Sequence, residues 1–253
     1  MFKRLLAQRI LSSRKSILLL GPRQTGKSTL IRGLKPDLTV NLAREQTFLE
    51  FSSSPGLLEK IIAQETPKTI FLDEVQRLPS LLNTIQAILD ERPKEHRFFL
   101  TGSSARKLKR GQANLLPGRI ITHRLGPLLV EEVGKKLNIE GYLAYGTLPG
   151  ILSESDEKER QAILRTYAST YLKEEIQAEA LTKNIEGFSR FLMVAASKSG
   201  EFLDFAKLGG LASISQKTST RYFEILEDTL IVHRLDAYAS NETRRLVRHP
   251  KYY

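Results

Sequence analysis

The sequence has 253 residues, of which 41% are hydrophobic and 26% charged, a composition typical of a globular protein with one large domain or two smaller ones. The absence of cysteine excludes disulfides and thiolate metal sites, and the four scattered histidines suggest no metal cluster. No apolar run reaches the roughly 18 residues of a transmembrane helix, and the amino terminus lacks the pattern of a signal peptide, so we expect a cytoplasmic protein without membrane contact.

The formal net charge of +11 is concentrated in the first half of the chain. Residues 1–126 contain 22 lysines and arginines against 10 acidic residues, a net charge of +12, whereas residues 127–253 contain 17 against 18. A positive field of this kind favours polyanions, either a nucleotide or a nucleic acid. The alternative interpretation is a basic surface that serves only solubility.

The first half alternates strand-like and helix-like segments. Residues 2–13 carry apolar side chains at helical spacing, and the continuous apolar run over residues 16–20 is typical of a parallel strand buried on both faces. Further strands are predicted over residues 38–42, 69–72, 97–101 and 120–125, and further helices over residues 55–63 and 80–91. We therefore expect an α/β fold with a parallel sheet between two layers of helices.

Beyond about residue 127 the pattern becomes helical, with helices predicted over residues 156–180 and 184–198. The next segment predicts a short helix over residues 202–208, a break at Gly209 and Gly210, a helix over residues 216–228 and a strand over residues 231–235. This order is that of a winged helix-turn-helix. We expect three parts, which are a core over residues 1–126, a helical lid or linker region over residues 127–200 and a winged-helix-like domain over residues 201–253.

Residues 21–29 contain the pattern G-x-x-x-x-G-K-[ST] without a mismatch. The segment follows a buried strand and opens a helix, so successive backbone N–H groups point at one anion. We predict that Lys27 binds the β- and γ-phosphates of a nucleotide, that the Ser28 hydroxyl ligates Mg²⁺ and that Thr29 lies near the α-phosphate. The predicted nucleotide-binding residues are Gly21, Pro22, Arg23, Gln24, Thr25, Gly26, Lys27, Ser28 and Thr29.

Two carboxylates follow the apolar strand over residues 69–72. Asp73 is placed to bind Mg²⁺, and Glu74 to orient or deprotonate a water that attacks the γ-phosphate. Taken alone, an Asp-Glu pair after a strand is equally well explained as a helix N-cap. Its position on a central strand, 46 residues after Lys27, favours the catalytic interpretation and hydrolysis over mere nucleotide binding.

Three further residues are candidates for the same site. Thr101 or Ser103, at the end of the next strand, would polarise the attacking water, although a helix cap or turn explains them as well. Arg119 would stabilise developing γ-phosphate charge, either within its own chain or across a subunit interface. A surface arginine in a basic loop is the alternative for Arg119.

The ordered set of motifs resembles a family of bacterial and archaeal ATPases of the AAA+ superfamily, in which an ATPase core precedes a domain of unknown function. The matching segments are residues 21–29 (GPRQTGKST), 71–79 (FLDEVQRLP), 100–104 (LTGSS), 116–119 (LPGR), 142–150 (YLAYGTLPG), 167–175 and 214–229. The resemblance implies that Lys27 and Ser28 bind phosphate and Mg²⁺, that Asp73 and Glu74 are the metal and catalytic carboxylates, and that Thr101 or Ser103 is the sensor. In such proteins further sequence, commonly a nuclease-like fold, follows the winged helix, so we expect no nuclease activity from residues 1–253.

The predicted recognition helix suggests contact with double-stranded DNA. Lys217 and Arg221 would contact phosphates, with Thr218, Ser219 and Thr220 near phosphate or base edges, and the basic first half would add to the attraction. The net charge of the second half opposes this interpretation, and a structural or interaction role is the alternative.

Two functions are therefore compatible with the sequence. The favoured one is a Mg²⁺-dependent ATPase, alone or as a homo-oligomer, whose cycle moves the helical and winged-helix parts relative to the core. The other is a nucleotide-gated DNA-binding or regulatory switch with little turnover. GTP-specific chemistry is disfavoured because the Asn-Lys-x-Asp element is missing, and nothing indicates the acceptor pocket of a small-molecule kinase.

Overall fold

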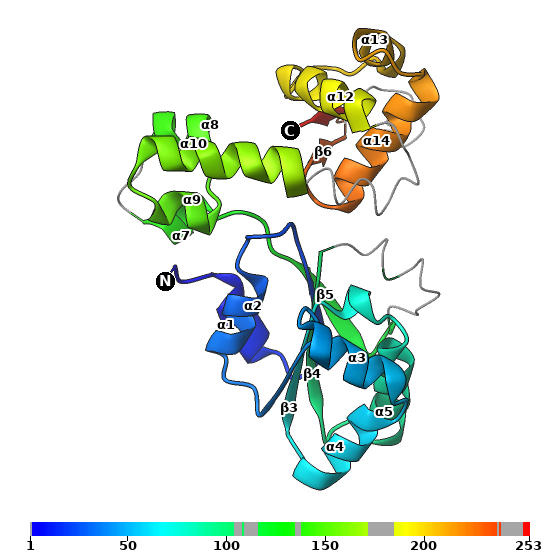
Figure 1. Ribbon diagram of the computed structural model, residues 1–253. Helices are drawn as coiled ribbons and strands as arrows, with labels where there is room; N and C mark the ends of the chain where they lie inside the picture. The colour runs from blue at the N-terminus through cyan, green and yellow to red at the C-terminus, as the bar shows by residue number, and fades with distance from the viewer. Residues whose placement is uncertain are drawn as a thin grey trace. The chain divides into compact units, whose positions relative to one another are not determined.

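The computed structural model describes residues 2–103, 108, 116–134, 138–171, 185–236, 238 and 250–253. The chain divides into two compact units, Met1–Ser155 and Asp156–Tyr253. Figure 1 traces the first unit from blue to green and the second from green to red. None of the described helices has the length and apolar character needed to cross a membrane.

A parallel sheet of five strands organises the first unit. Its strands are β1 (Ser16–Leu20), β2 (Leu38–Asn41), β3 (Thr69–Asp73), β4 (Arg97–Gly102) and β5 (Ile120–Arg124). The order across the sheet is β2-β3-β4-β1-β5, and every neighbouring pair is parallel. The predicted α/β fold with a parallel sheet is thereby confirmed. Strand β4 lies between β1 and β3, so all three end at the same edge.

Helices cover both faces of this sheet (Figure 1). On one face lie α1 (Leu6–Ser12) and α2 (Lys27–Gly33), and on the other lie α3 (Glu45–Ser53), α4 (Leu57–Glu65) and α5 (Leu81–Glu91). All five side chains of β1 are buried, as its unbroken apolar run predicts. On the α1–α2 side, Ile10 and Ile31 pack against Ile17, Leu19 and other sheet residues. The sequence patterns did not predict α3.

Short helices follow β5 in the same unit. They are α7 (Val130–Val133), α8 (Ile139–Tyr145) and α9 (Pro149–Ser153). Two of them begin with recognisable start signals: the Asn138 side chain accepts the Gly141 N–H at 3.0 Å, and Pro149 opens α9.

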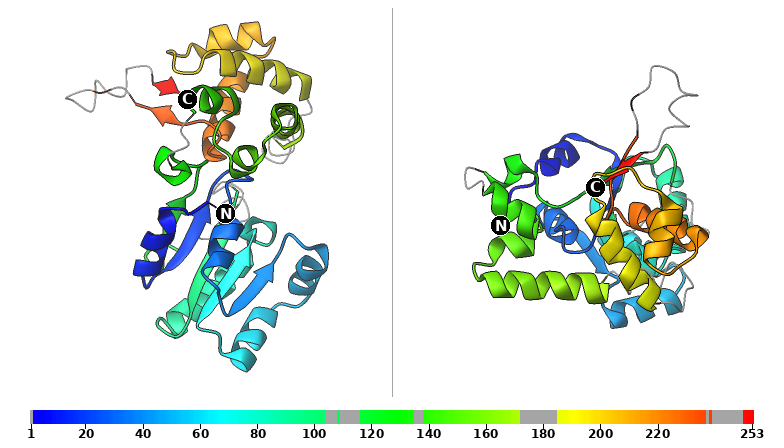
Figure 2. Two further views of the ribbon diagram at one scale, coloured as in Figure 1. Left: turned by 90° about the vertical axis from the view of Figure 1, so that its left-hand side faces the viewer. Right: turned by 90° about the horizontal axis from the view of Figure 1, so that it is seen from above.

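The second unit is mainly helical (Figure 2). It contains α10 (Glu157–Thr166), a π-helical turn η2 (Tyr167–Tyr171), α12 (Ile185–Ser197), α13 (Phe205–Leu211) and α14 (Gln216–Asp228). The short strands β6 (Arg234–Leu235) and β7 (Lys251–Tyr252) pair antiparallel. An aromatic cluster forms the core, in which Phe191 and Phe223 contact each other edge to face with ring centroids 5.2 Å apart.

Several helix and strand boundaries in this unit differ from those predicted from the sequence. The Gly209-Gly210 pair lies inside α13 rather than at a break. The Asp204 side chain caps the start of this helix by accepting the N–H groups of Ala206 and Lys207. A Cβ at Gly209 would lie 2.8 Å from the Ile214 carbonyl oxygen, so the glycine permits close packing against the turn before α14.

The strand predicted over residues 231–235 begins only at Arg234. The N–H groups of Ile231 and Val232 instead bond the Leu226 carbonyl, at 2.9 and 3.2 Å, and finish the end of α14. The helix predicted over residues 156–180 is observed as α10 and η2, and its last part lies outside the described residues.

Candidate nucleotide-binding site

The predicted phosphate loop joins β1 to α2 at the carboxyl edge of the sheet. The backbone at Leu125 comes so close to position 21 that only glycine fits there. A Cβ at Gly21 would lie 2.1 Å from the Leu125 carbonyl oxygen, far inside any normal contact. Gly26 has φ +87°, a left-handed conformation that glycine adopts without steric cost. Thr25 is fully buried and its hydroxyl donates to the Pro22 carbonyl at 2.9 Å, which closes the loop on itself. Arg23 and Gln24 are exposed at its tip.

Lys27 is enclosed by this loop. Its side chain is buried, and its Nζ donates to the carbonyl oxygens of Gly21 and Pro22, each at 2.8 Å. The ammonium therefore lies within the loop, where its charge is held by neutral acceptors. A phosphate oxygen is a stronger acceptor for an ammonium than a carbonyl is.

Asp73 is the centre of a compact polar cluster. Its Oδ1 accepts hydrogen bonds from Ser28 Oγ and from Thr101 Oγ1, each at 2.6 Å, and its Oδ2 lies 3.1 Å from the Arg32 guanidinium. The carboxylate is buried, with 3% of Asp73 exposed. Three strand or helix ends thus bring together Ser28, Asp73 and Thr101, which the sequence placed in one site. Arg32 was missed, although it follows Ser28 by one helical turn.

Glu74 follows with φ +61°, an unusual backbone conformation for a non-glycine residue. Its N–H donates to Thr101 Oγ1 at 3.1 Å, and its carboxylate accepts a hydrogen bond from the Gln76 side-chain amide. The same Gln76 amide lies 3.4 Å from Ser103 Oγ. Glu74 is therefore connected to the end of β4 through Thr101 and Gln76. Sequence reasoning missed Gln76, whose only signal was its place two residues after Glu74.

A pocket of about 370 Å³ adjoins the outer side of the loop. It extends from Gly26 and Thr29 past Leu30 and Leu34 to the segment that precedes α1. Its lining is Phe2, Lys3, Arg4, Ala7, Thr25, Gly26, Thr29, Leu30, Gly33, Leu34, Pro149, Gly150 and Ser153. Apolar and small side chains beside a phosphate loop suit a flat heterocyclic base.

The parallel α/β fold agrees with comparisons to known families. Residues 13–134 match the model of a family described as an AAA domain. Residues 136–253 match a family described as a domain of unknown function. The chain joins an AAA domain to a domain of unknown function. This confirms the resemblance found in the sequence motifs.

Two similar curated proteins are uncharacterised. An uncharacterised protein of Mycobacterium tuberculosis is 28% identical over 240 residues, which cover 94% of this chain and 53% of the relative. An uncharacterised protein of Haemophilus influenzae is 20% identical over 263 residues, covering 92% of this chain and 65% of the relative. The chain thus spans about half to two thirds of the length of these relatives.

Likenesses to solved structures are remote. The replication initiator DnaA bound to AMPPCP and single-stranded DNA aligns with a TM-score of 0.38 and 14% identity, over 88% of this chain and 86% of that one. The P-loop NTPase domain of a sigma-54 activator from E. coli aligns with a TM-score of 0.35 and 14% identity, over 49% of this chain and 91% of that one.

Arg119 lies at the opposite edge of the AAA domain's sheet from the phosphate loop. It precedes β5, whose first residue Ile120 pairs with Ser16 at the start of β1, whereas the loop follows the end of β1. Five strand residues span roughly 13 Å, so Arg119 does not reach the phosphates of its own loop. The prediction of a role within its own chain is therefore wrong.

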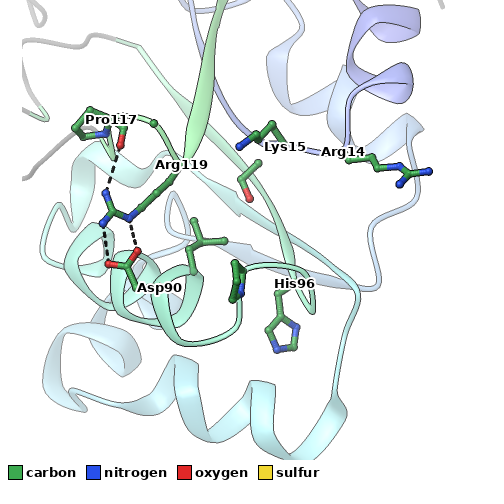
Figure 3. Close-up of a pocket in the computed structure, with 10 residues that line it drawn as sticks. Arg14, Lys15, Asp90, His96, Pro117 and Arg119 are labelled. Carbon is green, nitrogen blue, oxygen red and sulfur yellow. Dashed lines mark hydrogen bonds and ion pairs between the residues drawn. The ribbon is translucent and has the colours of Figure 1, made fainter.

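Arg119 has another partner at that edge. Figure 3 shows its guanidinium turned toward Asp90 of α5 in a second pocket of about 430 Å³. Its Nε lies 2.5 Å from Asp90 Oδ1, and this hydrogen bond lowers the pKa of Asp90.

The exposed face of α14 carries part of the predicted DNA contact. Lys217 and Arg221 are exposed one helical turn apart, whereas Ser219 is fully buried in the core of the second unit. The predicted contact of Ser219 with DNA is therefore wrong, because apolar packing of Tyr222 and Phe223 turns that side of the helix inward. Glu224 and Asp228 continue the exposed face with negative charge.

Proposed function

We propose that the AAA domain binds ATP with Mg²⁺ and hydrolyses it. One observation carries the proposal: beside the phosphate loop, Ser28 and Thr101 both donate hydrogen bonds to the Asp73 carboxylate, and the Glu74 backbone N–H donates to Thr101. These residues are on three elements that end at one edge of the sheet.

Each residue of the cluster has a proposed task. Lys27 exchanges its two loop carbonyls for the β- and γ-phosphate oxygens, which form stronger, charge-assisted hydrogen bonds. Ser28 and Asp73 would hold Mg²⁺, because hydroxyl and carboxylate oxygens are the donors that this hard cation prefers. When bound, Mg²⁺ supplies neutralisation of charge on the phosphate oxygens. Glu74 takes the proton of the attacking water. The Thr101 hydroxyl holds Glu74 in place by accepting the backbone N–H of Glu74.

The pocket beside Thr29 would hold the adenine base. Leu30 of α2, Leu34 directly after this helix, and Phe2 supply apolar surface for the ring. Burial of the ring in this pocket would remove apolar surface from water, which favours binding. ATP would thus extend from the phosphate loop across Gly26 toward the segment before α1. The backbone N–H groups of Arg23 through Thr29 would surround its phosphates, whereas Pro22, which has no N–H, would only shape the loop.

The test is a comparison of Glu74→Gln with the unaltered protein. We expect the variant to lose Mg²⁺-dependent phosphate release by about 100-fold or more while it retains nucleotide affinity. Binding is measured by the fluorescence of an ATP analogue, and Glu65→Gln, at an exposed position in α4, is the control. Equal loss of binding and turnover would contradict the assignment of Glu74. Lys27→Ala should instead weaken binding itself.

Hydrolysis would be coupled to conformational change, with residues 127–200 as a lid or linker region and residues 201–253 as a winged-helix-like domain. The succession of α13, α14 and the β6–β7 pair supports the winged-helix proposal. A homo-oligomer, in which Arg119 acts on the site of a neighbouring copy, is part of the proposal. If so, turnover per chain should rise with protein concentration in the unaltered protein and not in Arg119→Ala.

A nucleotide-gated DNA-binding switch with little turnover is the second candidate. The exposed pair Lys217 and Arg221, at the amino-terminal half of α14, favours it. Phosphate release measured with and without double-stranded DNA separates the two functions. Stimulation by DNA supports the coupled ATPase, whereas ATP-dependent retention of DNA without turnover supports the switch. Replacement of both cations by alanine should weaken DNA retention and reduce its salt dependence, with Lys207→Ala in α13 as control.

A further inference from the structure

Arg4 connects the start of the chain to the phosphate loop. Its side chain is 7% exposed, and Nη1 donates to the Thr25 carbonyl oxygen at 2.9 Å. Nη2 donates to the carbonyl oxygens of Gly126 and Pro127, at 2.9 and 3.2 Å. One guanidinium thus joins the loop after β1 to the turn after β5. Arg4 lies outside the segment that matches the AAA family and outside every motif.

The contact with Thr25 determines how the next peptide is oriented. No peptide bond in the described chain is cis, and in a planar trans peptide the C=O and N–H groups point in opposite directions. Since the Thr25 carbonyl points at Arg4, the Gly26 N–H points away from it and is available to a phosphate oxygen. Gly26, at φ +87°, has a backbone free enough to rotate, so the peptide needs an external contact to fix it.

Glu132 holds the guanidinium from its other side. Arg4 Nε lies 3.1 Å from Glu132 Oε2, out of line for a hydrogen bond but within ion-pair distance, and only 2% of the Glu132 side chain is exposed. Glu132 also accepts the N–H groups of Leu5 at 2.8 Å and of Leu129 at 3.0 Å. A buried ion pair is costly to desolvate, and two apolar side chains would fill the same space at less cost. A positioning role for Arg4 explains why an ion pair, rather than two apolar side chains, occupies this place.

We propose that Arg4 is a positioning residue for nucleotide binding, which fixes the Thr25–Gly26 peptide so that the Gly26 N–H faces the phosphates, with Glu132 holding Arg4 in turn. The proposal rests on the proposed nucleotide function. Arg4 does not touch the reacting atoms, so its effect is on affinity rather than on the chemical step. Arginine suits this task because its planar fork reaches three carbonyls at once, which the single ammonium of lysine does not.

The experiment measures binding of inorganic tripolyphosphate and of ATP to the full chain by calorimetry. Arg4→Met and Arg4→Lys are expected to weaken both affinities about 10- to 100-fold, the effect of losing a charge-assisted hydrogen bond. Glu132→Gln should give a smaller loss in the same direction. Arg9→Met, at an exposed position of α1, the helix that follows Arg4, should stay within twofold of the unaltered protein. Unfolding in urea establishes that the compared variants are folded, and Arg4→Lys or Glu132→Gln serves where Arg4→Met does not fold.

A spectroscopic readout separates positioning from mere stabilisation. With ¹⁵N-labelled glycine, the Gly26 amide resonance of the unaltered protein should shift when tripolyphosphate binds, and this shift should be reduced in folded Arg4→Lys. A full Gly26 shift with unchanged affinity in that variant would overturn the proposal. If the unaltered protein binds neither tripolyphosphate nor ATP, the proposed function fails and this inference fails with it. Binding by the unaltered protein with equal binding by the Arg4 variants contradicts only the inference.

Discussion

The Thr101 hydroxyl donates a 2.6 Å hydrogen bond to the buried carboxylate of Asp73, across the boundary between β4 and β3. The same oxygen accepts the backbone N–H of Glu74 at 3.1 Å. One side chain on the middle strand therefore holds both residues to which we assign metal binding and proton transfer. Any movement of β4 relative to β3 would change the positions of both carboxylates.

Replacement of Thr101 by valine keeps the shape of this side chain and removes its oxygen. We expect phosphate release to fall about 10- to 100-fold and the free energy of unfolding to fall by about 1–3 kcal/mol, because a buried donor and acceptor lose their partner. Urea unfolding and steady-state phosphate release measure the two effects. Thr101→Ser keeps the hydroxyl and should retain most activity. A fully active Thr101→Val protein would show that Thr101 has no part in the site.

Removal of the Gln76 side chain tests the second connection of Glu74. Gln76→Ala should lower kcat by about tenfold with little change in KM, because the amide orients Glu74 and touches no phosphate in the proposed site. Gln46→Ala is a matched control, since the Gln46 amide also donates to a glutamate, Glu50, but on the exposed face of α3. An equal effect of the two substitutions, or a change in KM alone, would contradict this assignment.

Alanine at Gly21 tests the close approach between the loop and β5. The added Cβ would lie 2.1 Å from the Leu125 carbonyl oxygen, so backbone must shift. We expect a loss of about 1–3 kcal/mol in the free energy of unfolding and loss of ATP binding. Gly210→Ala is the control, because nothing lies within 4 Å of its Cβ and alanine favours a helix by about 1 kcal/mol. Unchanged stability and affinity in Gly21→Ala would mean that the loop relaxes freely.

The Asp90–Arg119 pair predicts a dependence of stability on pH. The hydrogen bond from Arg119 lowers the pKa of Asp90 in the folded protein, so its contribution is present above the ordinary carboxylate pKa and is lost as pH falls through the lowered value. The Tm of the unaltered protein should exceed that of Asp90→Asn near pH 7, and the difference should shrink below about pH 4. Both the Asp90 carboxylate and the Arg119 guanidinium are partly exposed, so 1 M salt should also reduce this difference in Tm.

A pH-independent difference in Tm would contradict this assignment of the Asp90–Arg119 pair. Glu91→Gln, at the neighbouring exposed position, is the control and should show no comparable difference near pH 7.

The sequence by itself determined the local parts of this protein. Continuous apolar runs such as residues 16–20 predicted buried parallel strands, because only a sheet covered on both faces accepts such a run. The spacing of Gly21, Gly26, Lys27 and Ser28 predicted the phosphate loop, since backbone freedom and a helix start are local properties. The helix over residues 216–228 was predicted at its observed bounds, and in the structure the Ser215 side chain caps its start.

Only the tertiary structure decided which of these parts meet. The strand order places β4 between β1 and β3, and this brings Thr101 to Asp73 and leaves Arg119 at the opposite edge. The ion pair of Arg4 with Glu132 joins the start of the first unit to α7, and no periodicity or motif predicts such a contact. Strand order and long-range side-chain pairs follow from how whole elements pack, which depends on the combined surfaces of the chain and not on any single segment.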